Sequence, residues 1–318
     1  MKKILCIVIA LMMLLSMTAC GGTADEGTYT VGICQLVQHD ALDAATQGFQ
    51  DALTAKLGDK VTFELQNASG DQANCSTIIN GFVSNGVDLI MANATAPLQA
   101  AASATADIPV LGTSVTDYAS ALEIEGWTGT VGTNVSGTSD LAPLDQQAAM
   151  IQELFPDAKV VGLLYCSAEP NSVYQVEVVK AELEKLGYEA KLFSFNDAND
   201  LAAVTQTACD GSDVIYVPTD NVAATYPETI ANVVIPAKVP VVAGESNTCA
   251  ACGVASLSID YYELGKITGQ MAAKILKGEA DISTMAVQAA PNVVKMYNPE
   301  ICQQLGITPP AGYSPIGE

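Results

Sequence analysis

Two stretches of the chain decide the fold, because each reads as a copy of the other. Residues 31–71 are VGICQLVQHDALDAATQGFQDALTAKLGDKVTFELQNASGD. Residues 161–200 are VGLLYCSAEPNSVYQVEVVKAELEKLGYEAKLFSFNDAND, and in this alignment Gly32 falls on Gly162. Such self-similarity indicates two related structural units that follow each other along the chain.

The similarity continues downstream and gives both copies the same order of elements. GVDLIMANAT (86–95) matches GSDVIYVPTD (211–220), and IPVLGTS (108–114) matches VPVVAGES (239–246). Each copy reads strand, helix, strand, helix, strand, helix, strand. The strands are continuous apolar runs, which is typical of a parallel sheet that is covered on both faces.

These patterns predict an α/β fold with two Rossmann-like lobes, each a parallel sheet flanked by helices. A further strand and a long helix follow in residues 253–279, and a short last strand is expected near residues 293–297. Because this tail belongs to neither copy, the chain is expected to cross between the lobes more than once. We predict a first lobe of residues 29–137 and 247–283, and a second lobe of residues 138–246 and 284–318.

The N-terminus has the features of an export signal. Lys2 and Lys3 precede an apolar run over residues 4–15, and MTAC (17–20) followed by two glycines resembles a bacterial lipobox. We predict a signal peptide over residues 1–20, a lipid on Cys20 and a flexible tether over residues 21–28. A plain transmembrane anchor is the alternative. Both readings place the rest of the chain outside the cytoplasm.

The charge of the chain restricts its partners. The formal net charge is −22, which argues against nucleic acid or anionic lipid as a ligand. There is no arginine, so no guanidinium group can clamp a carboxylate or a phosphate. An anionic group on a ligand must therefore be held by backbone N–H groups, hydroxyls, amides or lysine.

The cysteines and the single histidine argue against a metal centre, and we expect no cofactor. Nine cysteines include Cys6 in the signal and Cys20, which leaves seven. The CAAC motif (249–252) falls in a predicted loop, where a disulfide or free thiols are expected, because zinc needs about two further ligands. His39 has no second histidine to join it.

Polar residues recur where the predicted strands of both copies end. In open parallel sheets ligands bind outside the carboxyl ends of the strands, so two facing lobes form a binding cleft. Ser, Thr, Asn and Asp also cap helices, but their recurrence at one edge in both copies favours a site. The strand-end residues include His39, Asn93–Ala94–Thr95, Thr113–Ser114, Glu169, Asn171–Ser172, Thr219–Asp220–Asn221, Glu245 and Asp260, with Ser139–Asp140 at the first crossing.

Motifs spread along the whole mature chain resemble one known family. They are QHDALDAATQGF, QNASGDQ, ATAPLQAAASATADIPV, TSVTD, GTSDLAP, VPTDN, AGE and IDYYELGKITGQMAAKILKGE. In this order they are similar to extracytoplasmic solute-binding lipoproteins of ABC importers, in particular the tryptophan/tyrosine-binding group. The resemblance implies a type I periplasmic-binding-protein fold with a hinge of three crossings. It also implies binding of a small amino acid or a related solute, with aromatic amino acids favoured, and cooperation with permease and ATPase subunits. We expect the protein to be a monomer.

The resemblance also implies where the ligand is bound. It places contacts at His39, Asn93, Ala94, Thr95, Thr113, Ser114, Thr116, Ser139, Asp140, Glu169, Asn171, Ser172, Asp220, Glu245 and Asp260. The chain departs from the family pattern at three positions. Asp40 stands where a proline-like residue is expected, Cys166 stands where asparagine is frequent, and Ser246 stands where a second acid is common.

A bound zwitterion gives these residues specific roles. We expect the ligand carboxylate near Thr95, Ser114, Ser139 and Ser172, and the ammonium group near Asp220, Glu245 or Asp260. An aromatic ring could contact Tyr118, Trp127 or Tyr165, although core or surface positions are the alternative for each. We expect His39 to donate a hydrogen bond to the solute or to the opposite lobe, facing the YCSAEPNS loop around Glu169.

Other functions remain open from the sequence. A sugar- or nucleoside-binding lipoprotein is the first alternative, although such sites commonly use arginine with stacking aromatic side chains. An enzyme is the second, but the chain contains no G-x-S-x-G, G-x-G-x-x-G, Walker or H-E-x-x-H motif. A lipoprotein that serves a sensor in place of a transporter is the third.

Overall fold

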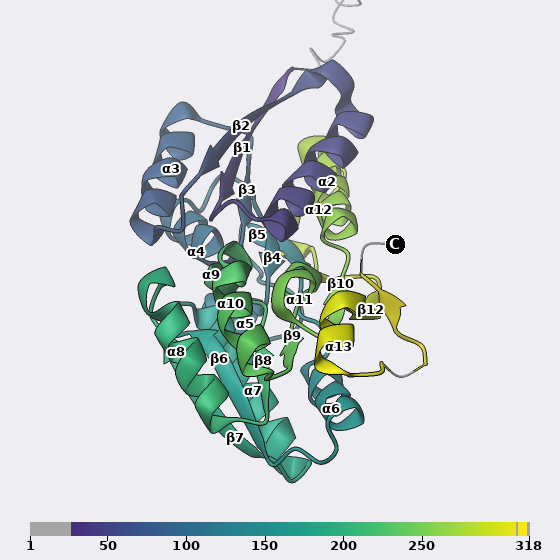
Figure 1. Ribbon diagram of the computed structural model, residues 1–318. Coiled ribbons are helices and arrows are strands. Elements are labelled where there is room, and N and C mark those ends of the chain that lie inside the picture. The colour runs from purple at the N-terminus through teal and green to yellow at the C-terminus, as the bar shows by residue number, and fades with distance from the viewer. Residues whose placement is uncertain (1–26, 310, 317–318) are drawn as a thin grey trace, which may run out of the picture.

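The structure, a computed structural model, describes residues 27–309 and 311–316. It contains two lobes, each built on one sheet with helices on both faces (Figure 1). The predicted signal peptide and Cys20 lie outside the described residues, as does most of the predicted tether. No helix among the described residues has the length and apolar character needed to cross a membrane.

The first lobe is built on a six-stranded sheet of the described chain. Its strands are β1 (Tyr29–Gln35), β2 (Val61–Asn67), β3 (Leu89–Asn93), β4 (Val110–Val115), β5 (Val135–Ser139) and β11 (Gln288–Ala289). They lie in the order β11-β5-β4-β3-β1-β2. The helices of this lobe are α2 (Asp40–Leu57), α3 (Gln72–Asn85), α4 (Thr95–Ala104), α5 (Tyr118–Ala121) and α12 (Tyr261–Leu276).

The second lobe is built on a seven-stranded sheet of the same described residues. Its strands are β6 (Val160–Cys166), β7 (Glu189–Phe195), β8 (Val214–Val217), β9 (Val241–Ala243), β10 (Ala255–Ile259), β12 (Val293–Tyr297) and β13 (Ser314–Pro315). They lie in the order β13-β12-β10-β9-β8-β6-β7. The helices are α6 (Leu144–Leu154), α7 (Pro170–Lys185), α8 (Ala198–Gly211), α9 (Asn221–Thr225), α10 (Pro227–Ala237), α11 (Ser246–Cys252) and α13 (Pro299–Leu305).

The repeat in the sequence is a repeat in the topology. The order β2-β1-β3-β4-β5 in the first sheet corresponds to β7-β6-β8-β9-β10 in the second. The aligned glycines, Gly32 in β1 and Gly162 in β6, both lie where a side chain from another segment packs closely on the strand. A Cβ atom on Gly32 would lie 2.6 Å from the Phe82 ring, and one on Gly162 would lie 2.4 Å from Ser212 Oγ. The predicted α/β fold with two Rossmann-like lobes is confirmed.

The predicted division of the tail between the lobes needs a correction. Strand β10 lies beside β9 in the second sheet, although residues 247–283 were expected in the first lobe. The reason is that β9, α11 and β10 form one continuous strand–helix–strand unit, which keeps β10 in the sheet of β9. The chain crosses back only after Ile259. Strand β11 pairs with β5 of the first sheet, so residues 288–289 also differ from the expected division.

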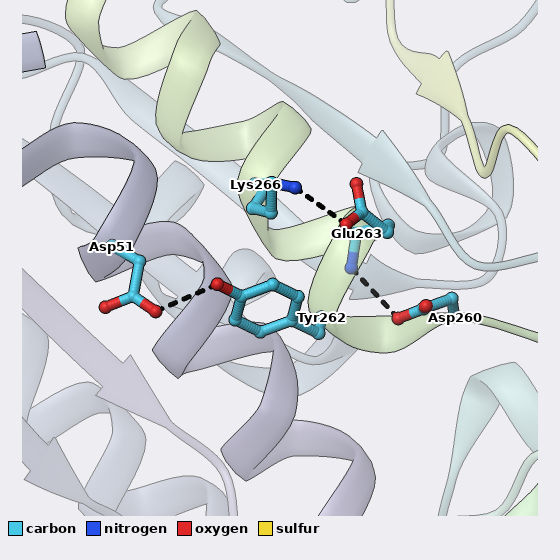
Figure 2. A network of polar contacts seen from close by, with 5 residues as sticks. All are labelled: Asp51, Asp260, Tyr262, Glu263 and Lys266. Atoms are coloured by element: carbon cyan, nitrogen blue, oxygen red, sulfur yellow. Dashed lines mark hydrogen bonds and ion pairs between the residues drawn. The ribbon is translucent and has the colours of Figure 1, made fainter. Parts of the chain in front are cut away.

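Helix α12 returns to the first lobe and packs against α2 (Figure 1). The two helices approach closely because glycines face the partner backbone. A Cβ atom on Gly265 would lie 2.0 Å from the Ala45 carbonyl oxygen, and one on Gly48 would lie 2.1 Å from the Tyr262 carbonyl oxygen. At the exposed edge of this pair, Tyr262 Oη donates to Asp51 Oδ2 at 3.0 Å (Figure 2). Residues from opposite ends of the chain thus complete one lobe.

Candidate binding site between the lobes

The carboxyl ends of the parallel strands from both lobes meet at a small enclosed cavity. Its volume is about 10 Å³, roughly the room that one water molecule needs. Residues of the first lobe, of the second lobe and of the crossings line it together. They are His39, Ala41, Leu42, Ser114 and Thr116 from the first lobe, Asn171, Thr219, Asp220, Asn221, Ala224 and Glu245 from the second, and Asp140 and Tyr261 at the crossings.

Two of the crossings are joined inside the cavity. Asp140 follows β5, where the chain first leaves the first lobe, and Tyr261 begins α12 directly after the second crossing. Both side chains are buried, and Tyr261 Oη donates a hydrogen bond to Asp140 Oδ2 at 2.9 Å. A third crossing lies between β11 and β12 within the described residues. The hinge therefore contributes side chains to the cavity itself.

A hydrogen bond connects the two lobes across the cavity. His39 Nε2 lies 3.3 Å from Asn221 Oδ1. Asn221 in turn donates to Glu169 Oε2 through its backbone N–H at 3.0 Å and its side-chain amide at 2.8 Å. Because the amide nitrogen of Asn221 faces Glu169, its oxygen faces His39 and accepts from Nε2–H. The expected bond from His39 to the opposite lobe is present, and its direct partner is Asn221.

Three buried polar atoms at the cavity have no hydrogen-bond partner. Among the described residues these unpartnered atoms include His39 Nδ1, Ser114 Oγ and Asp140 Oδ1. Ser114 and Asp140 are 7% and 4% exposed, respectively. A buried polar atom without a partner costs about 1–3 kcal/mol, more when it is charged. Their convergence on one cavity indicates that a polar ligand completes the site.

The backbone is strained beside the cavity. Ser114 has a φ of 53°, and Ala94, at the end of the neighbouring strand β3, has a φ of 101°. The register between β4 and β5 shifts between Gly112 and Val115, so the irregularity surrounds Ser114. Strained non-glycine residues concentrate at functional sites, where the surrounding structure holds them in place. The Ser114 hydroxyl is thus turned out of the regular strand pattern at the edge where ligands bind.

The other cavity carboxylates already have partners within the second lobe. Asp220 accepts from the backbone N–H groups of Cys166 at 2.7 Å and Ala223 at 2.9 Å. Glu245 accepts from the backbone N–H groups of Asn247, at 2.7 Å, and Thr248 at the start of α11. Backbone donors therefore occupy both side chains, which were expected to hold a ligand ammonium group.

Burial dominates the electrostatics of the site. It raises the pKa of Asp140 to about 6, although the Tyr261 and Thr116 hydroxyls act in the opposite direction. Burial, followed by the charge of Asp220, raises the pKa of Glu169 to about 7, and burial also raises the pKa of Asp220. Burial lowers the pKa of His39, against the pull of Glu245. Near neutral pH the imidazole is therefore uncharged, with one nitrogen free to accept.

Several predicted site residues lie directly behind the cavity wall. Asn93 Nδ2 donates to the Leu42 carbonyl oxygen at 2.8 Å, and Ser139 Oγ donates to the Thr116 carbonyl oxygen at 2.9 Å. Both bonds hold backbone that carries cavity-lining side chains. Other predicted residues that are buried here without lining the cavity are Ala94, Thr95, Thr113 and Ser172, and Glu169 is half-buried.

Asp260 is placed outside the cavity. Its exposed side chain accepts from the backbone N–H of Glu263 at 3.0 Å and so caps α12 (Figure 2). It lines a neighbouring open hollow of about 440 Å³ that shares Ala41 and Tyr261 with the cavity wall. The residue that reaches the cavity from this segment is Tyr261, which sequence reasoning missed. Its position two residues after the end of β10, directly after the helix cap Asp260, was the available signal.

None of the three aromatic candidates lines the cavity. Tyr118 is buried and donates to the Thr138 carbonyl oxygen at 3.1 Å. Trp127 stacks on it with ring centroids 6.5 Å apart. Tyr165 packs against the core of the second lobe. Tyr118 and Tyr165 are therefore core residues, which was the alternative expected for them. Tyr261 is the tyrosine that lines the cavity.

The cysteines belong to the cores of the lobes. All seven cysteines in the described residues are buried free thiols. The CAAC motif lies in α11 and not in a loop, and Cys252 Sγ donates to the Thr248 carbonyl oxygen at 3.2 Å. Within the described residues no three His, Cys, Asp or Glu side chains are grouped so that they could hold a metal ion.

Comparisons with known proteins agree with this geometry. The family described as ABC transporter substrate binding protein matches residues 30–312. A tyrosine-binding protein of Clostridioides difficile (strain R20291) is 34% identical over 295 residues, which cover 88% of this chain and 85% of the relative. A crystal structure from Streptococcus pneumonia in complex with L-Trp is also 34% identical. It has a TM-score of 0.86 and covers 91% of this chain and 99% of its own.

A second solved structure bears on the arrangement of the lobes. It is a ligand-free, open substrate-binding protein with adhesive properties from Clostridium difficile, with 34% identity and the same coverage. Its TM-score is 0.70, against 0.86 for the L-Trp complex. Identity and coverage are equal, yet this chain superposes less well on the ligand-free, open structure than on the L-Trp complex. Together with the bond between His39 and Asn221, this indicates that the lobes here are closed.

Proposed function

Because this chain belongs to the family of ABC transporter substrate-binding proteins, which act outside the cytoplasm, we propose that it captures a small amino acid between its lobes. Aromatic amino acids are the favoured ligands, since one relative is a tyrosine-binding protein and another was solved with L-Trp. The captured solute passes to the permease and ATPase subunits that partner with this family.

One observation carries the proposal. The enclosed cavity between the lobes presents the unpartnered atoms of His39, Ser114 and Asp140. They come from α2's N-terminal end, from β4 and from the first crossing, so a single polar ligand contacts a lobe and the hinge together. A ligand that meets more donors and acceptors in the closed state than in the open state stabilises closure by that difference.

The cavity itself is smaller than an amino acid. A space of about 10 Å³ cannot enclose an amino acid, so the lobes separate to admit one. The adjoining hollow of about 440 Å³, whose wall includes Ala41, Tyr261 and Met296, offers room for a side chain. A micromolar dissociation constant requires about −8 kcal/mol, which a few buried charge-assisted bonds supply.

The N-terminal segment fits delivery at a membrane surface. We propose that residues 1–20 are a signal peptide, that Cys20 carries the lipid and that residues 21–28 tether a monomeric binding protein. Replacement of Cys20 by serine is expected to release the protein from washed membranes into the soluble fraction. Retention in the membrane at the wild-type level would contradict a lipid anchor and favour the transmembrane alternative.

We also propose binding without turnover, as expected of a transport component. Thermal shift followed by calorimetry with L-tyrosine, L-tryptophan, other amino acids, sugars and nucleosides tests the function. A rise in Tm with an amino acid and with no sugar supports it. A rise with sugars or nucleosides alone overturns the amino-acid proposal, and chemical conversion of any bound compound overturns the absence of catalysis.

A further inference from the structure

We infer that Asp140 Oδ1, Ser114 Oγ and His39 Nδ1 together form the site for the primary ammonium group of the ligand, a role first expected of other carboxylates. The inference rests on the proposed function and specifies which atoms recognise the amino group. It also assigns His39 as a neutral acceptor toward the ligand, while the same ring donates across the lobes.

The number and type of the unpartnered atoms match an ammonium group. A primary ammonium has three N–H donors and no acceptor. A carboxylate oxygen, a hydroxyl oxygen and an imidazole nitrogen can each accept one of them, and all three residues line a cavity with room for about one water-sized group. No lysine side chain lines this cavity in the described part of the chain, so the negative charge of Asp140 is left for a ligand.

The tautomer of His39 follows from its neighbours in the second lobe. Glu169 Oε2 receives both N–H groups of Asn221, which turns the Asn221 oxygen toward His39. The proton of a neutral imidazole therefore sits on Nε2, 3.3 Å from that oxygen. Nδ1 then carries a lone pair and can accept from the ligand. Closure thus fixes an acceptor, because the opposite lobe holds the proton on the other nitrogen.

The remaining carboxylates are poor candidates for this role. Backbone N–H groups at 2.7 and 2.9 Å engage both oxygens of Asp220. The first turn of α11 engages both oxygens of Glu245. Asp260 is exposed and caps α12. Asp140 differs because Tyr261 Oη holds its Oδ2 at 2.9 Å while Oδ1 has no partner. Tyr261 therefore acts as a positioning residue that orients the free oxygen.

The test compares an amino acid with its analogues that lack one charged group. For L-tyrosine these are 3-(4-hydroxyphenyl)propanoate, which lacks the ammonium group, and tyramine, which lacks the carboxylate. Calorimetry is done with the full mature chain. If another amino acid binds more tightly than tyrosine, that amino acid and its own two analogues are used in place of the tyrosine series. The wild type is expected to bind the amino acid at least about 100-fold more tightly than the deaminated acid.

Three variants and one control separate the contributions. Asp140→Asn keeps the shape and removes the charge, so the preference for the amino acid over the deaminated acid is expected to shrink below about 10-fold. His39→Gln keeps a donor toward Asn221 and removes Nδ1, so about 10-fold of amino-acid affinity is lost. Ser114→Ala is expected to lose about 5-fold. Asp71→Asn makes the same change of charge at the N-cap of α3, away from the cavity and its adjoining hollow, keeps a good helix cap and leaves affinity unchanged.

The outcomes distinguish this inference from the proposed function. Equal binding of tyrosine and of its deaminated acid by the wild type overturns the ammonium site and leaves amino-acid binding intact. An unchanged preference in folded Asp140→Asn, judged by a wild-type circular dichroism spectrum, overturns it as well. Binding of a sugar or nucleoside with no binding of any ammonium compound overturns both proposals.

Discussion

The Nε2 atom of His39 and the Oδ1 atom of Asn221 lie 3.3 Å apart. This contact joins the two lobes through residues that are 182 positions apart in the chain. This contact exists only while the cleft is closed. The His39 side chain makes no capping bond to α2, although it stands at the N-cap position of that helix. Its interactions therefore favour the closed state and contribute little to either lobe alone.

Replacing His39 with alanine is therefore expected to weaken amino-acid binding by about 10-fold or more, with a loss of less than about 1 kcal/mol in the unfolding free energy of the ligand-free protein. Calorimetry and urea denaturation measure the two quantities. A double-mutant cycle with Asn221→Ala is expected to show coupling in affinity of about 1 kcal/mol. A larger effect on stability than on binding would make His39 a structural loop residue.

The buried carboxyl of Glu169 predicts a dependence of stability on pH. Its pKa is raised from 4.5 to about 7, so between these values the folded protein binds more protons than the unfolded chain. The contribution of this group to the unfolding free energy is therefore largest below about pH 4.5, and it is lost as pH rises through 7. The full change is on the order of 3 kcal/mol.

Denaturant titrations of the ligand-free protein between pH 5 and pH 8 measure this slope. The charged neighbour of Glu169 is Asp220, whose pKa is raised in the same direction. Glu169→Gln keeps the shape of the side chain and is expected to flatten the slope by half or more. A stability that increases from pH 5 to pH 8 would show that Glu169 is not the buried acid described here.

Ligand affinity is expected to follow the opposite trend with pH. Asp140 accepts an ammonium group only when it is ionised, and burial raises its pKa to about 6. Affinity for an amino acid should therefore be constant from about pH 7 to 8 and fall about tenfold for each unit of pH below 6. Protonation of His39 at low pH acts in the same direction, because it removes an acceptor. Calorimetry across this range checks the trend, and the Asp140→Asn variant should lose most of it.

The contact of α2 with α12 predicts a large penalty for one methyl group. A Cβ atom on Gly265 would lie 2.0 Å from the Ala45 carbonyl oxygen, so Gly265→Ala should lower the unfolding free energy by about 2–3 kcal/mol. Gly81 in α3 is the matched control, because a Cβ atom there meets nothing within 4 Å. Gly81→Ala should stabilise the protein by up to about 1 kcal/mol. Equal Tm values for the two variants would contradict close packing of these helices.

Much of the fold could be predicted because the repeat doubles the signal of each strand and helix. The lobe to which β10 belongs could not be assigned in the same way. Residues 253–279 have no counterpart in the aligned copies, and a strand followed by a helix fits either lobe. Only pairing of β10 with β9 settles the matter, and that pairing depends on contacts between distant parts of the chain.

The candidate site was predictable in its location and less so in the roles of its residues. Strand ends identify His39, Ser114, Asp140, Asp220 and Glu245, all of which line the cavity. The sequence does not reveal that backbone N–H groups engage both oxygens of Asp220 and of Glu245, while one oxygen of Asp140 is left without a partner. For the same reason Asp260, an acid at a strand end, was predicted to contact the ligand, whereas its neighbour Tyr261 is the residue that reaches the cavity.

The return of α12 to the first lobe has a consequence for the order of folding. Helix α2 buries Phe49 and Leu53 in a cluster that includes Met271 and Ala272 of α12, which follow more than 200 residues later. A nascent chain that ends before residue 261 therefore lacks one layer of its first lobe, while the second lobe is already encoded in full up to β10. We expect the N-terminal part of the chain to stay unfolded until synthesis is nearly complete. This delay would suit a protein that crosses the membrane as an extended chain and acquires its native form on the far side.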